Sequence, residues 1–206
     1  MTFFSMRTRK KLWIYGWTAA AAVSAIVIQT TLLSHFPVKE AVPVFCNLPL
    51  TVAILWGAVY GSPMPSISPD ELRLSSATQI FLRQAMSGSV AGALMGGFFA
   101  ALYTSMVGVF PAYFVFAGWI GGYFCMRNTS RTLSFLCIPL VLVVTLLAET
   151  LMAWQLSLLG RTGTFDNLMQ IALPEAALNA ILAPFIYFPL RRWYDTVTSV
   201  KLVPHR

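Results

Sequence analysis

Six long apolar runs constrain the fold of this chain more than any other feature of its sequence. A bilayer core about 30 Å thick requires about 20 apolar residues in a helix, and each run is close to that size. With 57% hydrophobic and only 10% charged residues, the chain carries far less than the roughly 25% charge of a soluble domain. The sequence therefore predicts an all-α integral membrane protein with six transmembrane helices in a single domain, 12–190. The runs occupy residues 12–33, 43–60, 85–106, 109–126, 133–159 and 168–190.

The positions of Lys and Arg predict how these helices are oriented. If the N-terminus is cytoplasmic, twelve of the 14 basic residues lie on the inner side, and only Lys39 and Arg161 lie outside. Cytoplasmic segments of membrane proteins carry an excess of Lys and Arg. We therefore expect both termini in the cytoplasm, as a basic N-terminus at 1–11 and a basic tail at 191–206. The first run exceeds the roughly 7 to 15 residues of a secretory-signal core, so we expect it to stay as a membrane helix.

The formal net charge of +7 would suggest nucleic-acid binding in a soluble protein. Here the basic residues fall almost entirely between the apolar runs, where they set topology and contact lipid headgroups. We therefore expect membrane lipids, and no nucleic acid, among the binding partners.

The long inner segment 61–84 contains a predicted helix start. Ser68 can cap a helix, Pro69 suits the first helical position, and Asp70 and Glu71 place negative charge at the positive end of the helix dipole. The segment is either a connector with an apolar face on the membrane or a docking surface for a cytoplasmic partner. The sequence leaves both interpretations open.

Small residues recur at helical spacing in two of the runs. Gly88, Gly92 and Gly96 follow one another every four residues, and Gly118 and Gly122 repeat this spacing in the next run. In lipid, helices associate by close backbone approach, so a stripe of small residues indicates a packing face. This face packs either within the chain or against the membrane helix of a partner.

Two acidic residues and one amide lie inside the last two apolar runs. Glu149 and Glu175 are expected toward the outer leaflet, where a carboxylate reaches water, pairs with Arg161 or takes a proton. Glu175 follows Pro174, and an acid in the first turn of a helix complements its dipole. For Glu149 both a structural and a functional role stay open. Asn179 shares a face with Glu175, and we expect it to bond a neighbouring helix.

Signatures of catalysis, cofactor binding and metal binding are missing from the sequence. It has no phosphate-binding loop, no zinc-protease or nucleophile-elbow motif, and no acid cluster suited to magnesium. Cys46, Cys125 and Cys137 lie far apart without the pairing that zinc or a redox centre requires, and we interpret them as small buried residues. His35 and His205 lie at opposite ends of the chain. We therefore expect no enzyme, no cofactor and no metal; a lipid-modifying enzyme would need reactive groups that this sequence lacks.

Three stretches together resemble MreD, the small multi-pass subunit of the bacterial rod-shape, or elongation, machinery. The first begins at Asn47-Leu48-Pro49 and ends at Gly57. The second is the glycine-rich stretch 92–102, accompanied by 118–123. The third, 173–184, has a proline near each end and Asn179 between them, and Arg191-Arg192 follows it.

The chain departs from the family pattern at one position. Family members often carry an acid in a G-L-x-x-D pattern after the glycine-rich helix, whereas Leu102 is followed here by Tyr103 and Thr104. A role for that acid therefore does not transfer to this chain.

The resemblance implies a non-enzymatic scaffold in the bacterial inner membrane. Such a scaffold binds MreC and works with the MreB filament, a RodA-type glycosyltransferase and its partner transpeptidase. On this hypothesis the glycine stripe contributes to helix packing with these partners.

The alternative is a substrate-binding membrane subunit of a vitamin or small-molecule transporter. Vitamin-binding subunits of energy-coupling transporters have a similar size and six helices, and MreD resembles them in architecture. A transporter would need polar side chains that converge on one ligand. The candidates are Glu149, Glu175, Asn179 and Gln155.

Overall fold

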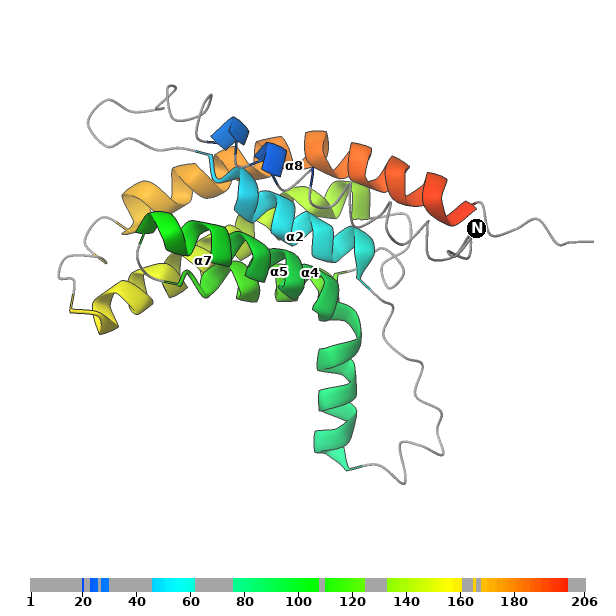
Figure 1. Ribbon diagram of the computed structural model, residues 1–206, viewed down its shortest axis with the longest axis horizontal. Coiled ribbons are helices and arrows are strands. Elements are labelled where there is room, and N and C mark those ends of the chain that lie inside the picture. Colours follow the sequence, from blue (N-terminus) through cyan, green and yellow to red (C-terminus); the bar gives the residue numbers. More distant parts are fainter. Residues whose placement is uncertain are drawn as a thin grey trace, which may run out of the picture.

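The computed structural model consists of helices throughout the part of the chain that it describes. The prediction of an all-α fold is confirmed for these residues, among which no strand occurs. The helices are α2 (Leu48–Tyr60), α4 (Ala77–Val107), α5 (Tyr113–Tyr123), α7 (Leu133–Leu158) and α8 (Leu168–Ser199) (Figure 1). The described residues are 20, 23–25, 27–29, 46–61, 76–107, 110–124, 133–160, 165 and 168–199.

Two of these helices are long and apolar enough to cross a membrane. Their apolar parts are Leu136–Leu158 in α7, with 23 residues, and Leu168–Asp195 in α8, with 28. Shorter apolar helices cover Leu48–Tyr60 and Val90–Thr104. Each of the last five predicted runs thus overlaps one helix. Of the first run, 12–33, only residues 20, 23–25 and 27–29 are described, and they are helical.

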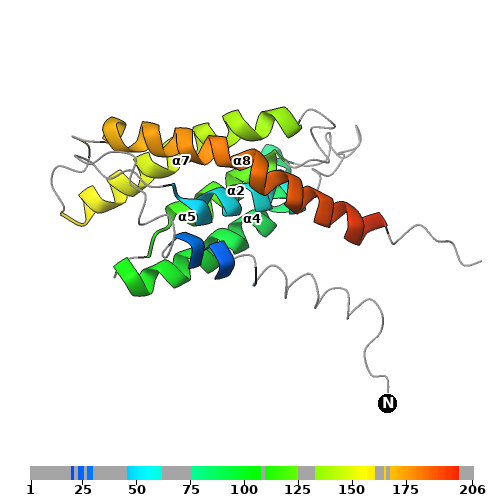
Figure 2. The same cartoon turned by 90° about the horizontal axis from the view of Figure 1, so that it is seen from above.

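Helix α2 lies in the middle of the bundle. It packs against α4, α5, α7 and α8, which surround it in both ribbon views (Figures 1 and 2). Every side chain from Pro49 to Val59 is buried. A helix that is apolar on all sides is buried either in a protein core or in a membrane. The contacts of α2 with four other helices place it at the core.

Apolar side chains also cover the outside of the bundle. Proteins in water rarely expose large contiguous apolar surfaces, and they seldom bury an acid without a partner. Here the buried polar residues include Thr145, Glu149 and Asn179, while the surface carries large hydrophobic side chains. This distribution suits a bundle surrounded by lipid. The exposed side chains include Leu94 and Phe98 of α4, Val143, Leu147, Trp154 and Leu158 of α7, and Leu173, Ile181, Phe185 and Phe188 of α8.

Helix α4 begins earlier than the apolar run that predicts it. Ser76 and Gln79 form a reciprocal cap: the Gln79 N–H donates to Ser76 Oγ at 3.3 Å, and the Ser76 N–H donates to Gln79 Oε1 at 3.4 Å. Such a box satisfies free amides at a helix start. The predicted cap, Ser68, lies outside the described residues. The last third of the inner segment 61–84 is therefore helical and continuous with the next apolar run.

The first part of α4 leaves the bundle at a steep angle to the rest of the helix (Figure 1). Sharp helix kinks occur mainly at proline or where glycine and serine are neighbours. Helix α4 has no proline, and it contains the sequence Ser87-Gly88-Ser89. We attribute the change of direction to this stretch.

Candidate functional site

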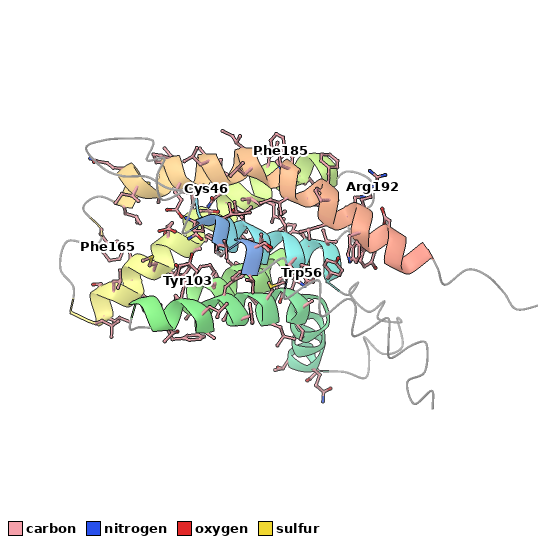
Figure 3. All side chains as sticks on the ribbon, turned by 45° about the horizontal axis from the view of Figure 1, so that its top comes forward. Cys46, Trp56, Tyr103, Phe165, Phe185 and Arg192 are labelled. Atoms are coloured by element: carbon pink, nitrogen blue, oxygen red, sulfur yellow. The ribbon has the colours of Figure 1, made fainter. Side chains whose placement is uncertain are left out.

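A cluster of polar side chains lies inside the bundle, at the end where α2 begins. We call it the polar cluster. Its members come from the start of α2 and from α5, α7 and α8. In Figure 3, Cys46 marks this end of the bundle and Arg192 marks the opposite end. The members are Cys46, Asn47, Tyr113, Thr145, Glu149, Glu175 and Asn179.

Asn179 joins three parts of the polar cluster. Its side chain is 0% exposed. Its Oδ1 accepts from the Asn47 backbone N–H at 2.8 Å and from Cys46 Sγ at 3.0 Å, and its Nδ2 donates to Thr145 Oγ1 at 3.5 Å. The expected bond from this amide to a neighbouring helix is thus present, and it connects α8 both to the start of α2 and to α7.

The free amides at the start of α2 all have partners. The first amides of a helix lack acceptors within the helix. The Leu48 N–H donates to Gln29 Oε1 at 2.9 Å, and the Leu50 N–H donates to the capping oxygen, Asn47 Oδ1, at 3.2 Å. Pro49 has no N–H, and the Asn47 N–H is bonded to Asn179. The start of α2 is therefore fully satisfied by its own cap, Asn47, together with Gln29 and Asn179 from elsewhere in the chain.

Glu149 of α7 and Glu175 of α8 are hydrogen-bonded to each other. Glu149 is buried and Glu175 half-buried. Two carboxylates repel when both are charged, so a hydrogen bond between them requires a proton on one of the two. The Asn47 side chain also bonds both Glu175 and the Tyr113 hydroxyl. Of the sequence expectations for these acids, uptake of a proton is compatible with this contact; Arg161 lies outside the described residues.

The expected first-turn position of Glu175 is wrong. Helix α8 begins at Leu168 and continues through Pro174, so Glu175 lies in its third turn, not at a free helix end. Proline is tolerated within membrane helices, where neighbouring helices and side chains compensate for the missing backbone hydrogen bond. The carboxyl of Glu175 therefore interacts with Glu149 and Asn47 instead of with a helix dipole.

A second feature is a junction where three helices meet at glycines. A β-carbon added to Gly92 of α4 would overlap the carbonyl oxygen of Gly118 of α5, and it would lie 2.8 Å from Cα of Gly57 in α2. One added to Gly96 would overlap the Phe114 carbonyl oxygen. Backbone meets backbone here, so Gly92, Gly96 and Gly118 pack within the chain and are not available to a partner helix.

Of the two remaining predicted glycines, the structure describes the surroundings of Gly122 but not those of Gly88. Gly122 is buried in α5, and its backbone nitrogen lies close to Gly57. The surroundings of Gly88 lie outside the described part. Sequence reasoning missed Gly121, whose added β-carbon would overlap the Ile54 carbonyl oxygen. Gly121 has no glycine four residues away, so the spacing search could not find it; Gly57 does, at Gly61, but that pair was not used.

Some members of the polar cluster carried a signal that the sequence analysis did not use. An asparagine two residues before a proline, at the start of an apolar run, is typical of a helix N-cap, and Asn47 fills that role. Thr145 precedes Glu149 by four residues and shares its face. Gln155 was expected with this set, but its Nε2 donates to the Phe110 carbonyl oxygen at 2.6 Å and not to a member of the cluster.

No group of three or more His, Cys, Asp or Glu residues suited to a metal ion occurs within the described ranges. Cys46 and Cys137 are buried free thiols, and Cys125 is not described. Comparison of the chain with protein-family models, curated proteins and solved structures gives no match.

Proposed function

We propose that this protein is a non-enzymatic scaffold of the cell-wall elongation machinery, similar to MreD, in the bacterial inner membrane. One observation carries the proposal: the three stretches that resemble MreD contact one another. Asn47 of the first bonds Asn179 of the third, and Gly57 of the first meets Gly92 of the second. The resemblance therefore falls on residues that contact one another within the bundle.

The proposed topology has six transmembrane helices, with both termini in the cytoplasm. The apolar exterior and the lengths of α7 and α8 support it. Helix α2 has 13 residues and is about 20 Å long, short of the roughly 30 Å of a bilayer core. If its last residue, Tyr60, lies at the cytoplasmic boundary, α2 begins within the membrane, where an unpaired amide is costly. The polar cluster provides the partners that such a start requires.

The proposed partners are MreC, the MreB filament, a RodA-type glycosyltransferase and its partner transpeptidase. Because Gly92, Gly96 and Gly118 are packed inside the chain, membrane partners would contact the outer faces of α4 and α7. These faces are apolar, as a contact between membrane helices requires.

The test is affinity purification of the tagged protein from its native membrane in mild detergent, followed by mass spectrometry. We expect MreC and a RodA-type polymerase to be recovered with it. Recovery of a pair of ATPases and a coupling membrane protein would contradict the proposal. An untagged strain controls for non-specific recovery.

The second candidate is a substrate-binding subunit of a small-molecule transporter. One observation favours it: Glu149, Glu175 and Asn179 converge, together with Asn47 and Tyr113, as ligand-binding groups would. Their hydrogen bonds run mainly between cluster members, which favours a role in holding helices together.

Two substitutions of Glu149 distinguish a helix-packing role of the polar cluster from a ligand-binding role. In Glu149→Gln the amide donates the hydrogen bond that a protonated carboxyl would supply. We therefore expect a thermal midpoint within about 3 °C of wild type and unchanged recovery of MreC. Glu149→Ala removes the bond and leaves a cavity, and it should cost about 2 kcal/mol or more. If Glu149→Gln folds normally but loses partner recovery or rod shape, the carboxyl is needed chemically and the scaffold role of the cluster is wrong.

A further inference from the structure

The outward face of α8 carries a stripe of exposed apolar side chains that ends in a basic residue. Ile181, Phe185 and Phe188 are 63%, 73% and 54% exposed, and exposed Arg192 follows them. The four residues are spaced by four, three and four positions, which places them on one side of a helix. Phe185 and Arg192 both point away from the bundle in Figure 3.

The stripe matches one leaflet of a bilayer in length. From Ile181 to Arg192 there are eleven helical steps, or about 16 Å. Half of a bilayer core is about 15 Å thick. If Ile181 lies near the membrane midplane, the Arg192 guanidinium therefore reaches the depth of the lipid phosphates.

Tyr194, two residues after Arg192, connects this end of α8 to α2. Its ring meets Tyr60 edge-on at 5.5 Å, and Tyr60 stacks on Trp56 with ring centroids 4.0 Å apart. Helix α8 continues past this level to Ser199, so its last turns extend beyond the apolar region.

We propose that this face of α8 binds an anionic phospholipid of the cytoplasmic leaflet. Arg192 holds the phosphate, and an acyl chain lies along Phe188, Phe185 and Ile181. The positive charge of Arg192 favours an anionic lipid over an uncharged one. The outer face of α7 is also apolar, but α7 contains no Lys or Arg, so we expect no such preference there. The inference rests on the membrane placement proposed above and is independent of which protein partners bind.

The test uses native mass spectrometry of the purified full chain with phosphatidylglycerol or phosphatidylcholine added. We expect wild type to retain phosphatidylglycerol preferentially, and Arg192→Gln to lower that retention about fivefold. Arg191→Gln is the matched control. It removes the same charge one residue away, about 100° around the helix, at a side chain that faces Asp195 at 3.9 Å. This variant should keep most of the retention.

Two results would overturn the inference. Equal losses in Arg191→Gln and Arg192→Gln would mean that net charge alone attracts the lipid. Equal retention of both lipids by wild type would mean that no such site exists.

The variant Phe185→Ala tests the contact with the acyl chain. We expect it to retain less phosphatidylglycerol than wild type, although the charge of the protein is unchanged. Recovery of MreC by wild type is measured separately, so failure of the lipid site and failure of the scaffold proposal are distinguishable.

Discussion

Replacing Gly92 with alanine is expected to prevent α4 and α5 from packing and to abolish recovery of folded protein. The new methyl group would overlap the Gly118 carbonyl oxygen and press on Cα of Gly57. These are backbone atoms of two other helices, so no change of rotamer relieves the overlap. We expect a cost above about 3 kcal/mol, at the upper end for overpacked cores. The measurement is size-exclusion chromatography of a fluorescent fusion, with the thermal midpoint of any monodisperse fraction.

The chain offers a matched control for this prediction in two adjacent glycines. A β-carbon on Gly96 would overlap the Phe114 carbonyl oxygen, whereas one on Gly97 would lie 3.9 Å from Val115 Cγ2, an ordinary contact. Gly97→Ala should therefore be neutral, or stabilising by up to about 1 kcal/mol through helix propensity. Similar midpoints for Gly96→Ala and Gly97→Ala would show that α4 and α5 are not in backbone contact.

The glycine junction also limits what partner-binding experiments can show. A bulky residue at Gly92 would reduce recovery of MreC even if MreC bound elsewhere, because the bundle itself would be lost. Substitutions on the outer faces, such as Leu147→Ala on α7 or Leu94→Ala on α4, change exposed side chains and leave the junction intact. They are the informative variants for mapping a partner.

The positions of the helices were predictable from the sequence, but several of their ends were not. Apolar runs locate helices because burial and lipid contact dominate their energetics. Helix ends depend on local hydrogen bonds, which need not coincide with the apolar boundary. Helix α4 extends outward to the cap at Ser76, and α8 passes its expected stop at Arg191-Arg192 and reaches Ser199.

The polar cluster was only partly predictable for a related reason. Glu149, Glu175 and Asn179 stand out because polar residues are rare within apolar runs. Asn47 and Tyr113 lie near the edges of runs, where polar residues are common and carry no comparable signal. That they meet the acids depends on how α2 and α5 pack in three dimensions, which spacing along one helix does not reveal.

Asn179→Leu is the second substitution expected to have a large effect. Leucine keeps the branched shape of asparagine, with bulkier methyl groups, and leaves the Asn47 N–H and the Thr145 hydroxyl without their bonds to Asn179. A buried donor without an acceptor costs about 1 to 3 kcal/mol, so we expect a loss of about 2 to 4 kcal/mol in unfolding free energy. Cys46→Ala is the control: it removes only a weak S–H donor to the same oxygen and should cost less than about 1 kcal/mol. Both are measured by unfolding in mixed detergent. If Asn179→Leu lost no more unfolding free energy than Cys46→Ala, the start of α2 would not need this amide. The polar cluster would then require another explanation, and ligand binding would be the first to test.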